Sequence, residues 1–224
     1  MYRNELKYVM NRPTAMLMSS RMEKLLRFDD HAGPKGQYRV TSLYFDDYGD
    51  NALNDNLIGQ IARKKFRIRV YNKDDTYIRL EKKVKHNKGG IKESVLLSKE
   101  AYRRILQGEF EFLRDSQIAL LREFYIELTA RNLKPKVIVE YDRQTFVYDY
   151  GQVRITFDKH IRYERNKLDV FEKEAMFLPA IQPDQVVMEV KFTGFLPNVI
   201  KAMIQESGLI QQSVSKYSIS RTRA

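Results

Sequence analysis

The chain has 224 residues and a formal net charge of +11, because 40 Lys and Arg outnumber 29 Asp and Glu. Hydrophobic residues make up 43% of it, with 12 Phe and 14 Tyr, which is enough for the core of one domain over residues 1–224. It has no cysteine, which excludes disulfides and thiol catalysis. No apolar run approaches the roughly 18 residues of a membrane span, and the start lacks the apolar stretch of a signal peptide. The sequence therefore predicts a cytoplasmic protein whose charge favours anionic partners.

The first half of the chain predicts one helix and several strands. Pro13 suits the first turn of a helix that extends to about Arg27. A loop from His31 to Gly36 leads to a strand at 38–46, and a polar turn rich in Asp, Asn and Gly follows up to Asn56. The next expected elements are a strand pair at 61–71 and 77–85 with a loop at 72–75, a turn at 87–90 and a strand at 91–97.

The second half predicts helices between further strands. Ser98 is a good N-cap for a helix from Lys99 to about Gln107, and Gly108 ends it. Many antiparallel strands with helices interspersed predict an α+β domain. The remaining expected elements are a helix at roughly 115–131, a hairpin at 136–148 and 152–163, a charged connection at 164–185, a strand at 186–193, a helix between Pro197 and Gly208, and a tail that contains Ser215-Lys216-Tyr217.

Several predicted strands separate apolar from charged side chains. In the strand at 61–71, Phe66, Ile68 and Val70 fall on one face, because side chains alternate along a strand. The opposite face carries Lys65, Arg67, Arg69 and Tyr71. The same separation recurs at Glu5/Lys7 against Leu6/Tyr8, Arg79/Glu81/Lys83 against Ile78/Leu80, Arg154/Asp158 against Val153/Ile155/Phe157, and Glu189/Lys191 against Met188/Val190/Phe192.

Two interpretations of the charged faces remain open at this point. An antiparallel sheet that meets water on one side produces this alternation without any function. However, the charged faces are rich in arginine, whose guanidinium suits bidentate phosphate or carboxylate contacts, and a solvated face does not need that residue. The functional interpretation is a polyanion site lined by strand side chains.

The order of the charged motifs resembles a known family. The motifs are Glu5-x-Lys7, Leu43-Tyr44-Phe45-Asp46, Arg63-x-Lys65-x-Arg67-x-Arg69-x-Tyr71, Glu81-x-Lys83, Lys92, Tyr141-x-Arg143, Arg154-x-Thr156-x-Asp158, Glu189-x-Lys191 and Ser215-Lys216-Tyr217. Together they resemble the VTC domain, the catalytic module of the vacuolar transporter chaperone polyphosphate polymerase, which is related to the triphosphate tunnel enzymes of the CYTH superfamily. The resemblance extends from Glu5 to Tyr217.

The resemblance implies a closed antiparallel β-barrel tunnel with a charged interior and several flanking helices. It implies that Arg67 and Arg69 hold the β and γ phosphates, and that Glu189 is the metal ligand. Glu5, Glu81 and Asp158 are the further metal candidates. The catalytic residues that it implies are Arg67, Arg69, Lys83 and Lys191, and the phosphate-binding residues are Lys7, Lys65, Lys92, Arg143, Arg154 and Lys216.

The implied activity is metal-dependent phosphoryl transfer from ATP to build inorganic polyphosphate, with Mn²⁺ or Mg²⁺ as cofactor. The alternatives are a triphosphate hydrolase of the same architecture and a non-enzymatic module that binds polyphosphate or nucleotides. We expect no specific nucleic acid partner, because the aromatic residues do not interleave with the basic ones as in a stacking platform. The resemblance is compatible with a membrane protein as partner, although no membrane-spanning segment is predicted in this chain.

Overall fold

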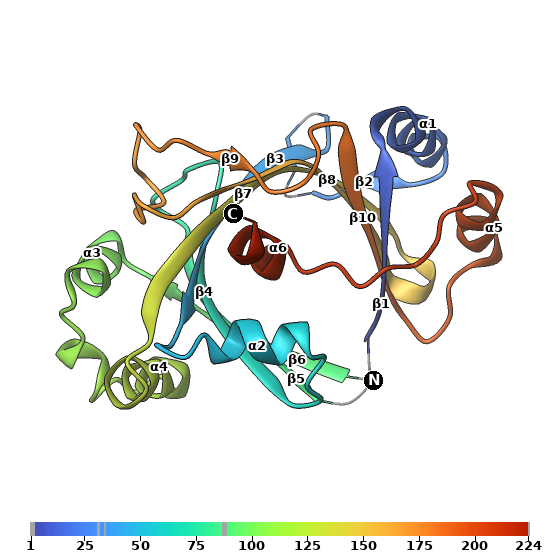
Figure 1. The fold of residues 1–224 in the computed structure, drawn as a ribbon. Coiled ribbons are helices and arrows are strands. Elements are labelled where there is room, and N and C mark those ends of the chain that lie inside the picture. The colour runs from blue at the N-terminus through green and yellow to red at the C-terminus, as the bar shows by residue number, and fades with distance from the viewer. Residues whose placement is uncertain (1–2, 31, 34, 87–88, 224) are drawn as a thin grey trace. The chain divides into compact units, whose positions relative to one another are not determined.

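The computed structural model describes residues 3–30, 32–33, 35–86 and 89–223 (Figure 1). Their contacts divide the chain into two compact units. Unit 1 contains Met1–Arg39, Tyr141–Ile161 and Pro179–Ser215, and unit 2 contains Val40–Glu140, Arg162–Leu178 and Lys216–Ala224. Three strands pass from one unit into the other: β3 (Gln37–Asp46), β7 (Lys134–Tyr148) and β8 (Val153–Glu164). The expected single domain over 1–224 therefore stays a prediction.

Unit 1 is an antiparallel sheet with helices on its apolar face. Its strands follow the order β1 (Arg3–Asn11), β10 (Gln185–Thr193), β8 and β7. The helices α1 (Arg12–Glu23) and α5 (Asn198–Glu206) lie outside β1 and β10 in Figure 1. Buried residues of both helices, such as Met18 and Ile204, join one hydrophobic cluster with Met188 and Phe157 of the strands. The opposite face is left to the charged side chains.

Unit 2 repeats this division with other elements. Its strand order is β7, β3, β4 (Arg63–Tyr71), β5 (Ile78–His86) and β6 (Gly89–Leu97). Its hydrophobic cluster joins Ile68 of β4 to Phe124 of α4 and Tyr102 of α3. The remaining elements of the chain are α2 (Asn51–Leu57), α3 (Lys99–Gln107), α4 (Ala119–Ala130), α6 (Lys216–Thr222), the short strands β2 (Arg27–Phe28) and β9 (Leu178–Pro179), and the 3-10 turns η1 (Glu111–Leu113) and η2 (Tyr150–Gln152).

The α+β class and the predicted strands are confirmed, with shifts of one or two residues at most of their ends. The cap at Ser98 is also present, because its side chain accepts from the amide of Ala101 and Gly108 takes the left-handed conformation at the end of α3. The first helix ends at Glu23 rather than near Arg27, and Arg27 instead begins β2, which pairs with β7. Of the predicted loop and turn residues, His31, Pro34, Asn87 and Lys88 lie outside the described residues.

Sequence patterns missed two helices, α2 and α6. Asp46, which is 1% exposed, accepts from the amides of Ala52 at 2.9 Å and Leu53 at 3.0 Å, and so holds the first turn of α2. The hydroxyl of Tyr217 in α6 also donates to Asp46. Both helices have seven residues, so they depend on tertiary contacts of this kind more than on intrinsic propensity.

The closed barrel implied by the resemblance is not what the described strands form. In unit 2 the strand order ends on β6, which pairs with β5 alone among the described strands. In unit 1 it ends on β1, and the chain after α5 lies along the outer edge of that strand. Gln211 bridges Tyr8 there, and the amide of Gln212 donates to the carbonyl of Lys7. This segment takes the hydrogen bonds that a closing strand would need, so the sheet is open at these edges.

Within the described ranges, no helix has the length and apolar character that crossing a membrane requires.

Phe124→Ala should lower the free energy of unfolding by about 3 to 5 kcal/mol, measured by chemical denaturation. Phe124 is 0% exposed and packs on Phe66 and Phe45 with ring centroids 5.3 and 5.2 Å apart. Ile126 on the same helix is 56% exposed, so Ile126→Ala should change stability by about 0.5 kcal/mol or less. Equal effects of the two changes would contradict the packing described for α4.

Candidate functional site

In unit 2, three cations converge on one buried carboxylate. Glu81 of β5 is 1% exposed. Its Oε2 accepts from Nε and Nη2 of Arg67 at 2.7 and 2.6 Å, and its Oε1 accepts from Lys92 Nζ at 2.8 Å. Arg69 Nη1 lies 3.8 Å from Oε2. These four residues, Glu81, Arg67, Arg69 and Lys92, are called the Glu81 cluster below.

The Glu81 cluster is charged at neutral pH. Burial alone would raise the pKa of the Glu81 carboxyl, but the charges of Arg67 and Arg69 and the hydrogen bond from Lys92 outweigh it and hold that pKa far below its usual range. The carboxylate is therefore ionised wherever the protein is folded under ordinary conditions. Its effect is to fix the two guanidinium groups in one orientation before any ligand binds.

Two hydroxyl groups from β3 complete the positioning of these arginines. Arg67 Nη1 donates to Tyr44 Oη at 3.0 Å, and Arg69 Nε donates to Ser42 Oγ at 3.0 Å. Burial acts to raise the pKa of Tyr44, but Arg67, Arg69 and Lys216 lower it below its ordinary value. Ser42 and Tyr44 are not among the site residues predicted from the sequence. Their register with Arg69 and Arg67 across β3 and β4 is the signal that could have found them.

The predicted lysines of unit 2 lie around the Glu81 cluster. Lys65, Lys83 and Lys92 pair in register across β4, β5 and β6, which places them in one row. Lys65 Nζ lies 5.3 Å from the centre of the Tyr217 ring, and Tyr217 stacks on Tyr44 with centroids 5.0 Å apart. Lys216 begins α6, and its charge acts on Tyr44. The structure therefore brings together Arg67, Arg69, Lys65, Lys83, Lys92 and Lys216.

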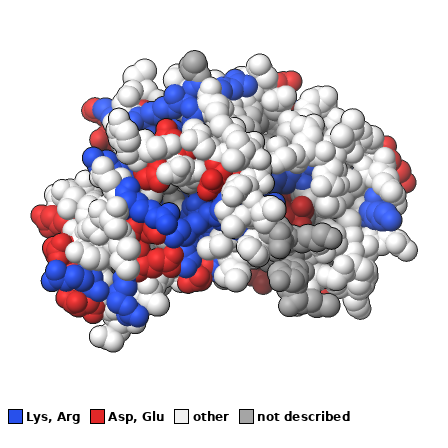
Figure 2. Space-filling view, turned by 60° about the horizontal axis from the view of Figure 1, so that its bottom comes forward, with Lys and Arg blue, Asp and Glu red and all other residues white. Residues whose placement is uncertain are grey.

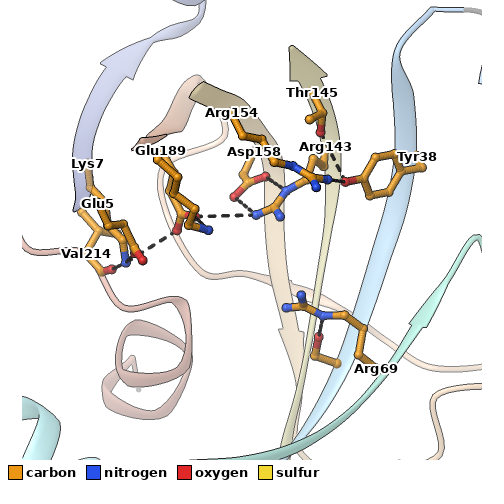
Figure 3. A network of polar contacts seen from close by, with 12 residues as sticks. Glu5, Lys7, Tyr38, Arg69, Arg143, Thr145, Arg154, Asp158, Glu189 and Val214 are labelled. Carbon is orange, nitrogen blue, oxygen red and sulfur yellow. Dashed lines mark hydrogen bonds and ion pairs between the residues drawn. The ribbon is translucent and has the colours of Figure 1, made fainter. Parts of the chain in front are cut away.

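In unit 1, three oxygen atoms surround an ammonium group (Figure 3). Lys7 Nζ lies 3.0 Å from a Glu5 oxygen and 3.5 Å from Glu189 Oε1, and it donates to the carbonyl of Val214 at 2.7 Å. Glu189 Oε2 accepts from Lys191 at 2.9 Å. The alternation of β1 and β10 produces this arrangement, because Lys7 pairs with Glu189 and Glu5 pairs with Lys191 across the two strands. Glu5, Lys7, Glu189 and Lys191 form the Lys7 cluster.

A buried guanidinium lies beside the Lys7 cluster in unit 1. Arg143 donates to both oxygens of Asp158 at 2.6 and 2.8 Å, and its Nη2 is 4.0 Å from Glu189 (Figure 3). Burial opposes the charge of Arg143, but Asp158, Tyr141 and Glu189 raise its pKa well above the ordinary value. Burial lowers the pKa of Lys191, and Arg143 adds to this effect against the opposing charges of Glu189 and Glu5.

Arg154 and Thr156 of β8 continue the charged face of unit 1. Arg154 Nη2 contacts Tyr38 Oη at 3.1 Å and Asp29 at 3.0 Å. Thr156 pairs with Glu189 in register, is 1% exposed, and its hydroxyl has no hydrogen-bond partner in the structure. Tyr38 and Thr156 are not among the site residues predicted from the sequence. The R-x-T-x-D spacing signals that Thr156 shares a face with Arg154 and Asp158.

The four metal candidates are placed differently. Glu5 and Glu189 face the same ammonium, whereas both oxygens of Asp158 bind Arg143, and Glu81 belongs to unit 2. Across the described residues, no group of three or more carboxylate, histidine or cysteine side chains is arranged to hold a metal ion.

On the face shown in Figure 2, Lys and Arg gather with Asp and Glu among them, so the basic residues are interspersed with acidic ones.

The fold and these clusters define a class: an antiparallel α+β protein whose charged strand face gathers arginine and lysine around buried carboxylates. The chain belongs to the VTC domain family, since the family model for the VTC domain matches residues 2–223. The resemblance carried by the sequence motifs is thereby confirmed. No curated protein matches the chain in sequence.

Solved structures share the fold at low identity. A proposed adenylate cyclase from Bacillus halodurans has 15% identity and a TM-score of 0.55, with 100% of both chains covered. The PH1819 protein from Pyrococcus horikoshii OT3 has 12% identity and a TM-score of 0.50, with 97% of each chain covered. These likenesses show the fold alone.

Glu81→Gln should lower the free energy of unfolding by about 3 to 5 kcal/mol at pH 7, because it removes the counterion of the largely buried Arg67 and Arg69. The folded-state pKa of Glu81 lies below the unfolded value, so the carboxylate stabilises the protein above the ordinary glutamate pKa of about 4.3. As pH falls below that value, the contribution is progressively lost. The difference in free energy of unfolding between wild type and variant, measured by chemical denaturation, should therefore be constant above about pH 5 and become smaller in acid. A gap that widens in acid would contradict the assignment.

Proposed function

We propose that this protein transfers phosphoryl groups from ATP to build inorganic polyphosphate, in a reaction that depends on a divalent cation. The observation that carries the proposal is the convergence of Arg67, Arg69 and Lys92 at the buried Glu81. Membership of the VTC domain family supports the substrate class.

The Glu81 cluster suits phosphate recognition because its donors are fixed in advance. Guanidinium groups form bidentate contacts with phosphate oxygens, and a cation already oriented by a carboxylate loses little further freedom when an anion arrives. Arg67 keeps its Tyr44 contact and Arg69 its Ser42 contact at the same time. The row of Lys65, Lys83 and Lys92 adds ammonium groups, which hold phosphate oxygens as point charges. We assign these residues to the triphosphate of ATP or to the end of a polyphosphate chain.

Glu5 and Glu189 are the carboxylates of unit 1 that we assign to a divalent cation. In the structure their oxygens and the Val214 carbonyl surround the Lys7 ammonium, so cation binding requires that ammonium to move away from the two carboxylates. Mg²⁺ and Mn²⁺ prefer such oxygen ligands, and Mg²⁺ is commonly held by one or two carboxylates together with substrate phosphates and water. Glu189 and Glu5 would hold the ion, and the ion would supply charge stabilisation of the transferring phosphoryl group. Both oxygens of Asp158 accept hydrogen bonds from Arg143, so we assign Asp158 to positioning that guanidinium.

The residues of the chain act mainly by electrostatics and positioning. Phosphoryl transfer passes through a transition state whose charge is spread over the phosphoryl oxygens, so fixed cations lower its energy. We assign this role to Arg67, Arg69 and Lys83 in unit 2 and to Lys191 in unit 1. Within unit 1, Lys7, Arg143 and Arg154 are assigned to phosphate binding, and within unit 2 Lys216 is assigned to it.

Two other functions share this chemistry. If water accepts the phosphoryl group, the protein is a triphosphate hydrolase. If no transfer occurs, it is a module that binds polyphosphate or nucleotides, which its net charge of +11 also permits. Incubation with ATP and Mn²⁺, followed by gel analysis and phosphorus NMR, separates them. A growing phosphate chain supports the polymerase, orthophosphate without chains supports the hydrolase, and unchanged ATP supports the binding module.

Short duplex DNA should compete poorly with tripolyphosphate for binding to the protein. Equal displacement of bound tripolyphosphate by DNA and by unlabelled tripolyphosphate would favour a general basic surface.

Arg67→Ala and Arg69→Ala should each weaken tripolyphosphate binding by about 1.5 to 3 kcal/mol in calorimetry, because each removes charge-assisted hydrogen bonds to phosphate. Lysine at either position should restore binding only in part. Arg103→Ala removes an exposed cation of α3 in the same unit and serves as the control for net charge. Circular dichroism selects the folded samples, and unchanged binding by both folded site variants would refute the assignment.

Glu189→Gln should abolish most turnover of ATP while tripolyphosphate binding without metal persists or strengthens. The change keeps the size of the side chain but removes the negative charge that a divalent cation requires. Glu206→Gln on the exposed face of α5 is the control in the same unit. A purely structural Glu189 would give the opposite pattern, with a lower melting temperature and normal activity per folded molecule.

A further inference from the structure

Arg79 is a cation of the charged face that has no role in the function proposed so far. It lies on β5 two residues before Glu81, is partly buried, and pairs in register with Arg69 of β4. Side chains of residues paired in this way on one face lie about 4.5 to 5.5 Å apart at Cβ. Two cationic side chains are therefore carried by directly paired residues of neighbouring strands, and one of them, Arg69, belongs to the Glu81 cluster.

Arg79 contacts two hydroxyl groups and the ring of Tyr77, whose centroid lies 5.6 Å from the Arg79 Cζ. Its Nη1 donates to Tyr77 Oη at 3.1 Å, and its Nη2 donates to Ser94 Oγ of β6. Its Nε is buried and has no hydrogen-bond partner in the structure. Among the described residues, Arg79 forms no ion pair with a carboxylate, in contrast to Arg67, Arg69 and Lys92.

This arrangement is unfavourable for stability alone. Like charges directly opposite each other on a sheet destabilise it, and a partly buried cation without a counterion carries some desolvation cost. A buried donor that lacks a partner adds to that cost. An anion bound by Arg79 on this face would offset all three costs. The hydroxyls of Tyr77 and Ser94 accept from Arg79 and keep their own O–H groups to donate to such an anion.

We propose that Arg79, with Arg69, Ser94 and Tyr77, forms a second phosphate subsite adjacent to the Glu81 cluster. This inference rests on the proposed function and extends it. Arg79 lies two residues along β5, about 7 Å, closer to the loop between β4 and β5 than Glu81 does. It extends the cation track along the strand direction, which suits a linear phosphate chain rather than a single phosphate ion. The ligand that it recognises is an internal or terminal phosphate of that chain.

The test compares Arg79→Gln with wild type in calorimetric titrations of tripolyphosphate and of orthophosphate at physiological ionic strength. Arg79→Gln should bind tripolyphosphate about 10-fold or more weakly, because it removes a charge-assisted contact. Its affinity for orthophosphate should change little, because the Glu81 cluster remains intact. The tripolyphosphate affinity of Arg79→Lys should lie between those of wild type and Arg79→Gln. Arg103→Gln, which removes the same charge from the exposed face of α3, should match wild type with both ligands.

Thermal melting without ligand distinguishes a binding role from a structural one. Removal of an uncompensated cation opposite Arg69 should leave the melting temperature of Arg79→Gln unchanged or raise it, whereas loss of a structural contact would lower it. Equal tripolyphosphate affinity of Arg79→Gln and Arg103→Gln would overturn the subsite while leaving the proposed function standing. A wild-type protein that binds no tripolyphosphate would overturn both.

Discussion

The alternation of side chains along the strands is the constraint on which the rest of the structure depends. A slip of one residue in the register of β4 would move Phe66, Ile68 and Val70 out of the core and Arg67 and Arg69 into it. The hydrophobic clusters beneath α3 and α4 therefore fix the charged face as firmly as they fix the apolar one. In unit 1 the cluster beneath α1 and α5 has the same effect on Lys7 and Glu189. The energy that positions the charges comes from burial on the opposite side of the same strands.

Buried carboxylates make this concentration of cations tolerable. Glu81, Asp158 and Glu189 each lie within 4.0 Å of two or more cationic nitrogens or of both donors of one arginine. Such pairs add little net stability, because desolvation offsets most of their attraction. Their contribution is to orient guanidinium and ammonium groups that would otherwise be mobile. A side chain held in this way is suited to electrostatic stabilisation of a transition state, which requires little reorganisation during the reaction.

The sequence predicted the elements whose signal is local. Strand alternation at 63–71 and the Ser98 cap are visible within a few residues of sequence, and the structure has them. The α2 and α6 helices were missed, because seven residues carry little propensity and their support comes from Asp46, which is distant from Tyr217 in sequence. The hydroxyl partners Ser42, Tyr38 and Ser94 were missed for the same reason. The expected closed barrel was also wrong, since the segment at Gln211 and Gln212 forms hydrogen bonds with the outer edge of β1.

The same long-range contacts connect the C-terminal helix to the candidate phosphate site. Asp46 holds both the first turn of α2 and the hydroxyl of Tyr217, and Tyr217 stacks on Tyr44, which in turn accepts from Arg67. Arg221 of α6 pairs with Asp50 at 2.7 Å, which holds the other end of this short helix. The position of Arg67 is therefore set from two directions, by Glu81 on its own sheet and by a chain of aromatic and acidic residues that ends in α6. A change in α6 would reach the phosphate site through Tyr44, although α6 itself contributes only Lys216 to the predicted binding residues.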